Sequence, residues 1–261
     1  MNEIFKRYEK KYILTNAQRE MLLNKIGEHL VPDEYGPSTI CNIYFDTNDH
    51  DLIRESMDKP FYKEKVRMRS YNTPGKDSNV FLEIKKKYDG VVYKRRITSS
   101  LHNIEDYVNN GINFDCNEQI KKEIDYCFKY YDLKPALFLA YDRVAFYDRD
   151  NKDFRVTFDT NIVSRDYDLK LESGVYGERF LKDDHYVMEV KCISGYPMWF
   201  VNILNELKIY PHSYSKYGTI YQESFEKEHD EFKYQKIETK NEVEKNTLSS
   251  GVIRKNVKAI A

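Results

Sequence analysis

The sequence predicts an α+β fold in which strands close into a barrel with a charged lumen, while helices cover an apolar exterior. Three observations favour this arrangement. At least six stretches alternate charged with apolar residues, the charged positions are mostly Lys and Arg, and the acids among them recur as Glu-x-Lys. Residues two apart in a strand point to the same side. Each stretch would therefore have one charged face and one apolar face.

The first strand is expected over residues 5–14, with Glu9 and Lys11 on one face. A helix follows, because Thr15 with Gln18 three residues later is typical of a capping box. The apolar stripe that this helix would bury comprises Met21, Leu22, Ile26 and Leu30.

A second strand is expected over residues 39–46, and a short polar segment follows it up to Met57. Residues 62–97 then contain three strands, and Asp89-Gly90 is typical of the hairpin between the last two. The residues on their charged faces are Lys63, Lys65, Arg67, Arg69, Glu83, Lys85, Lys87, Lys94 and Arg96. Three neighbouring rows that are mostly cationic indicate a polyanionic ligand.

The remaining elements continue the pattern. Helices are expected around residues 104–108 and 118–130, and another begins at Pro197. Three further strands are expected, over residues 136–148, 154–161 and 186–193. The charged residues on their polar faces are Arg143, Arg155, Asp159, Glu189 and Lys191.

A simpler arrangement stays open for this pattern: a sheet with one apolar face on a core and one charged face in water. Solvated faces usually mix both signs of charge, whereas these faces are biased to Lys and Arg. A cationic lumen is costly when empty, because two cations about 4 Å apart repel by roughly 4 kcal/mol at an effective dielectric near 20. The barrel therefore makes sense only if an anion occupies it.

Composition argues against several classes of protein. The chain has 261 residues and a formal net charge of −1, whereas a nucleic-acid-binding domain is usually net basic. Tyr and Phe mostly alternate away from the cationic faces, so a single-strand RNA-binding sheet is disfavoured and no nucleic-acid partner is expected. The four cysteines show no Cys-x-x-Cys spacing, which favours buried, reduced thiols.

The chain shows no apolar run of about 18 residues and no signal-peptide core at its start, so we expect a cytoplasmic protein with no transmembrane segment. From about Phe225 the composition changes, and residues 226–245 are dense in both signs of charge. We therefore expect a folded domain over residues 1–224 and a charged, flexible tail over residues 225–261. A membrane-protein partner that binds through this tail stays open.

In their order and spacing, the motifs resemble the triphosphate tunnel metalloenzymes (the CYTH-like superfamily). Within that group they are most similar to the VTC (vacuolar transporter chaperone) domain, the catalytic domain of polyphosphate polymerases. The resemblance covers roughly residues 3–224. The motifs that carry it are Lys10-Lys11-Tyr12, Tyr44-Phe45-Asp46-Thr47, Val66-Arg67-Met68-Arg69, Tyr141-Asp142-Arg143, Arg155-Val156-Thr157-Phe158-Asp159-Thr160-Asn161, Met188-Glu189-Val190-Lys191 and Ser213-Tyr214-Ser215-Lys216-Tyr217.

The resemblance implies an antiparallel β-barrel tunnel of about eight strands that binds a triphosphate through basic residues and a divalent metal. The catalytic residues that it implies are Arg67, Arg69, Lys85, Arg143 and Arg155. The substrate-binding residues are Lys11, Lys94, Tyr141, Lys191, Ser215 and Lys216. Glu189 would hold Mn²⁺ or Mg²⁺, with help from Glu9.

The implied activity is that of a polyphosphate polymerase, which moves the γ-phosphoryl of ATP onto inorganic polyphosphate. The chain departs from the family pattern at two positions. Hydrolytic members often begin with Glu-x-Glu-x-Lys, whereas this chain has Arg7 at the first position, which favours a polymerase. Polymerases carry Lys-x-Ser-Lys near the end, whereas Ser213 replaces the first Lys here. The alternatives are a triphosphate or nucleoside-triphosphate hydrolase and a non-catalytic polyphosphate-binding sensor.

Overall fold

The structure is a computed structural model that describes residues 8–89, 91–181, 184–193 and 195–224. The chain divides into two compact units, residues 1–218 and 219–261. Of the second unit only residues 219–224 are described, and they are helical. The predicted tail over residues 225–261 and the Arg7 position lie outside the described residues. The sheet, its helices and the candidate site all belong to the first unit.

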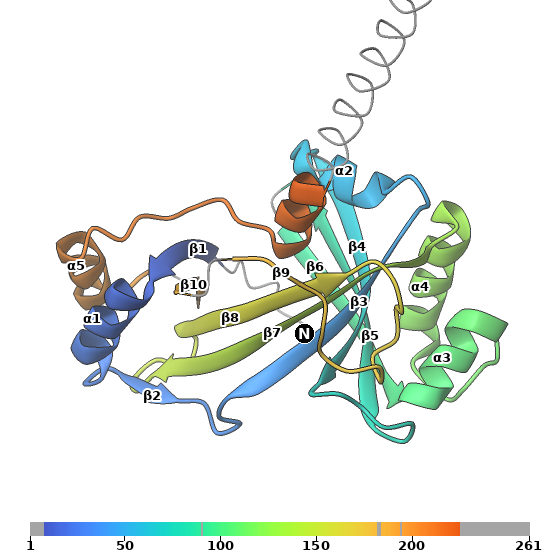
Figure 1. Cartoon of the computed structure of the whole chain (residues 1–261), viewed down its shortest axis with the longest axis horizontal. Coiled ribbons are helices and arrows are strands. Elements are labelled where there is room, and N and C mark those ends of the chain that lie inside the picture. The colour runs from blue at the N-terminus through green and yellow to red at the C-terminus, as the bar shows by residue number, and fades with distance from the viewer. Residues whose placement is uncertain (1–7, 90, 182–183, 194, 225–261) are drawn as a thin grey trace, which may run out of the picture. The chain divides into compact units, whose positions relative to one another are not determined.

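Among the described residues of the first unit, ten strands form one antiparallel sheet, whose course Figure 1 shows. They are β1 (Tyr8–Thr15), β2 (Leu30–Pro32), β3 (Ser38–Asp46), β4 (Tyr62–Tyr71), β5 (Asn79–Tyr88), β6 (Val91–Ser100), β7 (Lys134–Asp148), β8 (Arg155–Arg165), β9 (Glu178–Arg179) and β10 (His185–Cys192). The main path runs in the order β1-β10-β8-β7-β3-β4-β5-β6, while β2 pairs with β7 and β9 pairs with β8.

The sheet curls but does not close. In the described part of the chain, β1 and β6 end the path and do not pair with each other, so the expected closed barrel is an open, bent sheet. Figure 1 shows β4, β5 and β6 running steeply across the direction of β7 and β8. The register shifts at Tyr44/Phe45 in β3 and at Ala140/Asp142 in β7, and irregularities of this kind bend a strand and increase its local twist.

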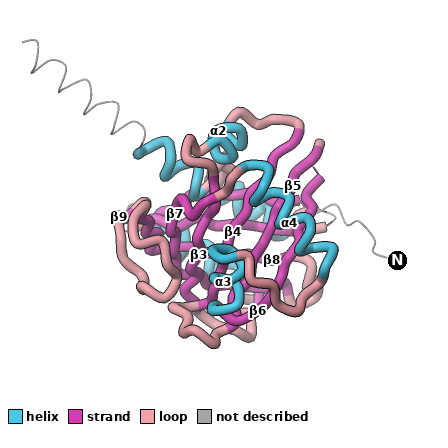
Figure 2. Tube along the Cα trace, turned by 90° about the vertical axis from the view of Figure 1, so that its right-hand side faces the viewer, coloured by secondary structure: helices cyan, strands magenta, loops and turns pink. Residues whose placement is uncertain are grey.

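Helices cover the apolar face of the sheet in two groups. They are α1 (Asn16–Ile26), α2 (Asp51–Met57), α3 (Leu101–Asn110), α4 (Glu118–Tyr131) and α5 (Met198–Glu206). Figure 2 looks onto α3 and α4, which pack on β3 to β6, and α1 and α5 pack on β1, β8 and β10. Within the described ranges, no helix is long and apolar enough to span a membrane.

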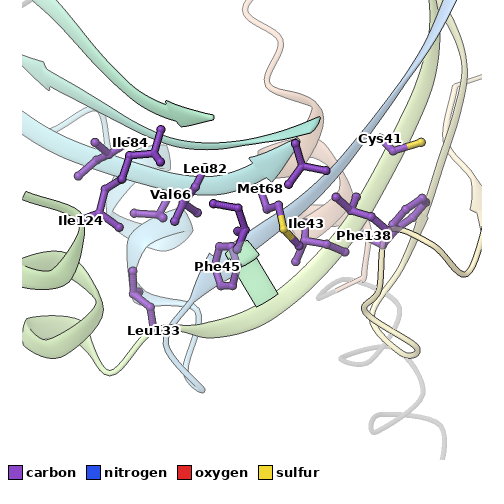
Figure 3. Packing of buried hydrophobic residues seen from close by; sticks show 14 of the residues in the cluster. Cys41, Ile43, Phe45, Val66, Met68, Leu82, Ile84, Ile124, Leu133 and Phe138 are labelled. Atoms are coloured by element: carbon purple, nitrogen blue, oxygen red, sulfur yellow. The ribbon is translucent and has the colours of Figure 1, made fainter. Parts of the chain in front are cut away.

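Each group of helices closes a hydrophobic cluster. In the first cluster, Val66, Leu82 and Ile84 of the sheet lie beside Ile124 of α4 (Figure 3). In the second, Leu22 of α1 and Phe200 of α5 pack with the residues of the β1–β10–β8 face, among them Phe158, Met188 and Val190. The apolar half of every alternating strand is thus buried on the helix side, which leaves the charged half on the opposite, interior side.

Several local predictions are confirmed, and others are wrong. The capping box of α1 is present, because the amide of Gln18 donates to Thr15 Oγ1 at 3.2 Å. The predicted stripe of α1 is only partly right: Leu22 and Ile26 are buried, but Met21 is 46% exposed and Leu30 belongs to β2. The four cysteines are free, as expected.

The helix α2 and the strands β2 and β9 were not expected. The polar segment before Met57 becomes helical because Asp46, at the end of β3, accepts hydrogen bonds from the amides of Leu52 at 2.9 Å and Ile53 at 3.1 Å. A carboxylate at a helix start satisfies amides that have no partner within the helix. The strands β2 and β9 have three and two residues, which is too short for an alternating pattern.

The helix-side packing predicts a large stability difference between two apolar truncations. Leu82→Ala should lower the free energy of unfolding by about 2–5 kcal/mol, because Leu82 is fully buried in the first cluster. Met21→Ala should change it by less than about 0.5 kcal/mol, because that side chain is largely in water. Urea unfolding followed by circular dichroism measures both, and equal losses would contradict this account of the core.

Candidate functional site

The charged faces of two distant parts of the sheet share one interior. Register places Lys11 of β1 opposite Glu189 of β10, and Lys65 of β4 opposite Lys85 of β5. The surrounding protein partly desolvates Lys85 and lowers its pKa, and the charges of Glu9 and Lys11 on β1 also act on it. Strands β1 and β5 do not pair, so these interactions cross the interior. We call the β1–β10–β8–β7 part and the β4–β5–β6 part the two walls.

Glu83 of β5 is the anionic centre of the β4–β5–β6 wall. Its side chain is 1% exposed and accepts from Arg67 Nε at 2.8 Å and from Arg96 Nε at 2.8 Å. Lys94 Nζ lies 2.6 Å from the same carboxylate, and Arg69 Nε lies 4.0 Å from it. Burial opposes ionisation, but Arg67 and Arg69 outweigh it and hold the pKa of Glu83 well below its usual range.

Asp159 of β8 plays the same part on the opposite wall. It is fully buried and accepts two hydrogen bonds from Arg143 of β7, from Nε at 2.6 Å and from NH2 at 2.7 Å. Lys216 also donates to it. The aromatic ring of Tyr141 lies beside both cations, 5.2 Å from Arg143 Cζ and 4.4 Å from Lys216 Nζ. Burial raises the pKa of Asp159, but Lys216 and Arg143 more than offset it and lower that pKa.

Two further carboxylates lie at the β1–β10 edge. Glu189 is buried and pairs with Lys191, while Glu9 is partly exposed and lies 3.4 Å from Lys11 and 3.9 Å from Lys191. Burial works against ionisation of Glu189, yet Lys191, Lys11 and Arg143 hold its pKa well below the usual value. Both carboxylates are on the interior face of neighbouring strands, in diagonal register.

The segment after α5 crosses the interior and joins both walls. The amide of His212 donates to the carbonyl of Lys11 at 2.7 Å, and Lys11 Nζ donates to the carbonyl of Tyr214 at 3.1 Å. On the other wall, Lys65 Nζ donates to Ser215 Oγ at 3.5 Å. These contacts bring Ser215 and Lys216 into the interior.

Arg155 of β8 makes its ion pair with a residue outside the predicted site, Asp33. Register places it opposite Lys191 on the interior face. Its guanidinium, however, donates to Asp33 Oδ2 at 2.9 Å and lies over the ring of Tyr147 at 5.0 Å. Asp33 thus fixes one end of the guanidinium, while Arg155 Nε is buried without a hydrogen-bond partner among the described residues.

The comparisons with known proteins agree with this geometry. The VTC domain family matches residues 6–225. The chain belongs to the VTC domain family. A candidate adenylate cyclase from Bacillus halodurans shares the fold: it is 16% identical, its alignment covers 82% of this chain and 94% of that chain, and the TM-score is 0.51.

Two other solved structures are more distant from this VTC domain. A Pyrococcus horikoshii protein is 13% identical over 84% of this chain and 98% of that one, with a TM-score of 0.46. A Hippeastrum candidate adenylyl cyclase is described as having a dominant triphosphatase activity. It is 13% identical over 82% of this chain and 94% of that chain, with a TM-score of 0.44. No curated protein sequence matches the chain. The family match confirms the resemblance to the VTC domain, and the Bacillus halodurans structure shares the fold.

Glu189 and Glu9 of this VTC domain suit a metal ion whose other ligands come mainly from a bound phosphate compound. Within the described ranges, no group of three or more His, Cys, Asp or Glu side chains could hold a metal ion. Glu189 and Glu9 supply two carboxylates, and the low pKa of Glu189 keeps it ionised. Mg²⁺ commonly binds one or two carboxylates plus substrate phosphates. The pair therefore suits Mg²⁺ or Mn²⁺ together with a phosphate ligand.

The structure also brings into the site residues to which the family resemblance assigned no role. Tyr44 of β3 accepts from Arg67 NH1 at 3.2 Å, and although burial raises its pKa, Arg67 and Arg69 lower it to about 8. Lys65 and Arg96 follow the same alternation as Arg67 and Lys94. The strand pattern therefore already predicted that they lie on the charged faces. Tyr44 and Asp159 lie within motifs that carry the resemblance, and both occupy interior faces.

The ion pairs of Glu83 predict a specific pH dependence of stability. The folded-state pKa of Glu83 lies below the ordinary value of 4.5, so its contribution is present above that pH and is lost as the pH falls toward the folded pKa. Glu83→Gln should lower the free energy of unfolding at neutral pH by about 3 kcal/mol, because it leaves several cations without their carboxylate.

Between about pH 5 and pH 3 the variant should also show a shallower loss of stability than the wild type, measured by urea unfolding at each pH. Glu123→Gln is the matched control, since Glu123 pairs with Arg95 at 3.6 Å on the outer face and should matter by at most about 1 kcal/mol. Parallel pH curves for wild type and Glu83→Gln would contradict the assignment.

Proposed function

We propose that this VTC domain is a metal-dependent polyphosphate polymerase that transfers the γ-phosphoryl of ATP to a polyphosphate chain. The observation that carries the proposal is the excess of cations on the interior faces of both walls. These cations are Lys11, Lys63, Lys65, Arg67, Arg69, Lys85, Lys87, Lys94, Arg96, Arg143, Arg155, Lys191 and Lys216. The carboxylates beside them are Glu9, Asp33, Glu83, Asp159 and Glu189.

Such an interior suits a reaction that depends on charge and position. The bond from the γ-phosphorus to the β-bridging oxygen breaks, a terminal oxygen of the acceptor chain bonds to that phosphorus, and ADP leaves. The acceptor oxygen is already ionised at neutral pH, so the transfer requires no general base. Catalysis then rests on alignment of the phosphates and on neutralisation of their charge.

The arginines are held in place before a ligand binds. Arg67 uses Nε and NH2 for Glu83 and NH1 for Tyr44, and Arg143 uses Nε and NH2 for Asp159. Among the hydrogen bonds of the described residues, none occupies NH1 of Arg143. A guanidinium fixed by one carboxylate can present its remaining N–H groups to a non-bridging phosphate oxygen. Arg143 is thus the arginine best prepared to orient the γ-phosphate.

The remaining roles follow from position. Lys11, Lys191 and Lys216 would bind phosphate oxygens along the β1–β10–β8 wall, and Arg67, Arg69, Lys85 and Lys94 would do so on the other wall. Tyr141 and Ser215 would add neutral hydrogen bonds. Glu189 and Glu9 would hold Mg²⁺ or Mn²⁺, which when bound neutralises phosphate charge. The cytoplasmic location and the partner of the tail stay predictions.

Incubation of the purified chain with ATP and Mn²⁺ or Mg²⁺ tests the proposal. We expect ADP and long polyphosphate, separated from free phosphate on a gel. Free phosphate without chains would instead indicate a hydrolase, and triphosphate binding without turnover would indicate a sensor. Arg67→Ala/Arg69→Ala should lower the rate by about a hundredfold or more, whereas Lys122→Ala, on the exposed side of α4, should leave it unchanged.

A second prediction concerns stability rather than turnover. Inorganic triphosphate should raise the melting temperature, because a ligand at 100 times its Kd adds about 2.7 kcal/mol to the free energy of unfolding. Differential scanning fluorimetry measures the shift, which should disappear in Arg67→Ala/Arg69→Ala and persist in Lys122→Ala. An unchanged melting curve for the wild type at saturating triphosphate would contradict a phosphate-binding interior.

A further inference from the structure

Four lysines form a ladder at one end of the β4–β5–β6 wall. Lys63 of β4 lies opposite Lys87 of β5, and Lys65 lies opposite Lys85. Opposed side chains on one face start about 5 Å apart, and successive pairs along the strands are about 7 Å apart. All four therefore share one small area of the interior face. Like charges directly opposite each other destabilise a sheet, so this arrangement calls for a ligand.

The ladder, unlike the rest of its wall, has no counter-ion. Over the described ranges, no carboxylate lies within 4.0 Å of any of the four ammonium groups. Lys63 Nζ donates to the carbonyl of Ser56 at 2.8 Å, and among the described residues the hydrogen bond of Lys65 Nζ is the 3.5 Å contact with Ser215 Oγ. Glu83, by contrast, neutralises the Arg67 end of the same strands.

The four charges are strong enough to affect one another. Desolvation, and after it the charges of Lys63 and Lys11, lower the pKa of Lys65 to about 8, although Tyr44 acts in the opposite direction. Desolvation and then Lys87 and Lys85 lower the pKa of Lys63, and Lys59 in the loop before β4 adds to this effect. The row of cations thus continues past the end of the sheet. Glu9, on the facing wall, is the acid that acts on Lys85.

The outer pair of the ladder, Lys63 and Lys87, lies away from the arginines. Lys63 is four residues from Arg67 along β4, which is about 13 Å in a strand. A triphosphate held at Arg67 extends over only part of that distance, whereas a linear chain of many phosphates can span it. Lysine is a compact point charge without the fixed fork of arginine, so it binds phosphates without imposing one orientation. A row of lysines therefore suits a chain that slides.

We propose that Lys63, Lys65, Lys85 and Lys87 bind successive phosphates of a long polyphosphate chain, and that this end of the interior is where the chain leaves the reacting site. The inference rests on the proposed function and adds the direction in which the product chain leaves the site. It assigns the arginines around Glu83 and Asp159 to the reacting phosphates and the lysine ladder to the distal chain.

Binding of two ligands to the full chain tests this assignment. Isothermal titration with inorganic triphosphate and with long-chain polyphosphate should show that the wild type binds the long chain more tightly. Lys63→Ala/Lys87→Ala should weaken long-chain binding by about tenfold and triphosphate binding by no more than about twofold. The slope of log affinity against log salt for the long chain should fall by about 1 to 2.

Two further variants serve as controls. Lys87→Ala alone should give part of the effect, and it removes no hydrogen bond made within the described residues. Lys122→Ala/Lys129→Ala removes the same number of charges from the exposed side of α4 and should change neither affinity. Melting curves of all variants check that each is folded.

The outcomes separate this inference from the proposed function. If the variant weakens binding of both ligands equally, or if the wild type does not prefer the long chain, the role of the ladder is contradicted. Triphosphate binding at the arginines would still stand. Length-dependent binding that needs the ladder, without any turnover of ATP, would support the ladder and overturn the polymerase. Binding of neither ligand by the wild type would overturn both.

Discussion

Repulsion among cations that face one interior is the constraint on which this structure depends. The curl of the sheet brings the β1–β10 edge close to β4 and β5, and the charges of Glu9 and Lys11 act on Lys85 across the interior. The walls stay together because their outer faces are buried under helices in two hydrophobic clusters. Within each wall a single buried carboxylate, Glu83 or Asp159, offsets the repulsion among several cations. The positive charge that these carboxylates do not neutralise is available to bind an anionic ligand.

The same constraint explains why arginine and lysine occupy different places. Arginines gather around the buried carboxylates, where the guanidinium fork can satisfy a carboxylate and a ligand at once. Arg67 and Arg143 both show this arrangement. Lysines such as Lys94 and Lys216 also contact these carboxylates, but within the described residues the pairs Lys63–Lys87 and Lys65–Lys85 have no carboxylate within ion-pair distance. A phosphoryl-transfer site needs fixed orientation at the reacting group and only charge along the rest of the polymer, and the two residue types match these needs.

Alternation within each strand predicted which side chains face the interior, because the two-residue period of a strand is a local property. It placed Arg67, Glu83 and Glu189 correctly, and the resemblance to the VTC domain is confirmed. The partner of each side chain depends on contacts between distant residues, which alternation does not contain. Arg155 is held by Asp33, Lys216 by Asp159 and Tyr217 by Asp46, and no periodicity encodes such pairs. Whether β1 and β6 pair and close the sheet likewise depends on the bend of the whole sheet, which the sequence pattern of a single strand does not predict.

The claim that both walls serve one anion is tested most directly by a crystal structure of the domain with bound triphosphate. The account predicts phosphate oxygens within hydrogen-bond distance of Arg67 on one wall and Arg143 on the other, in the same molecule. Triphosphate bound to one wall only, or to the outer face beside Lys86 and Arg95, would contradict it.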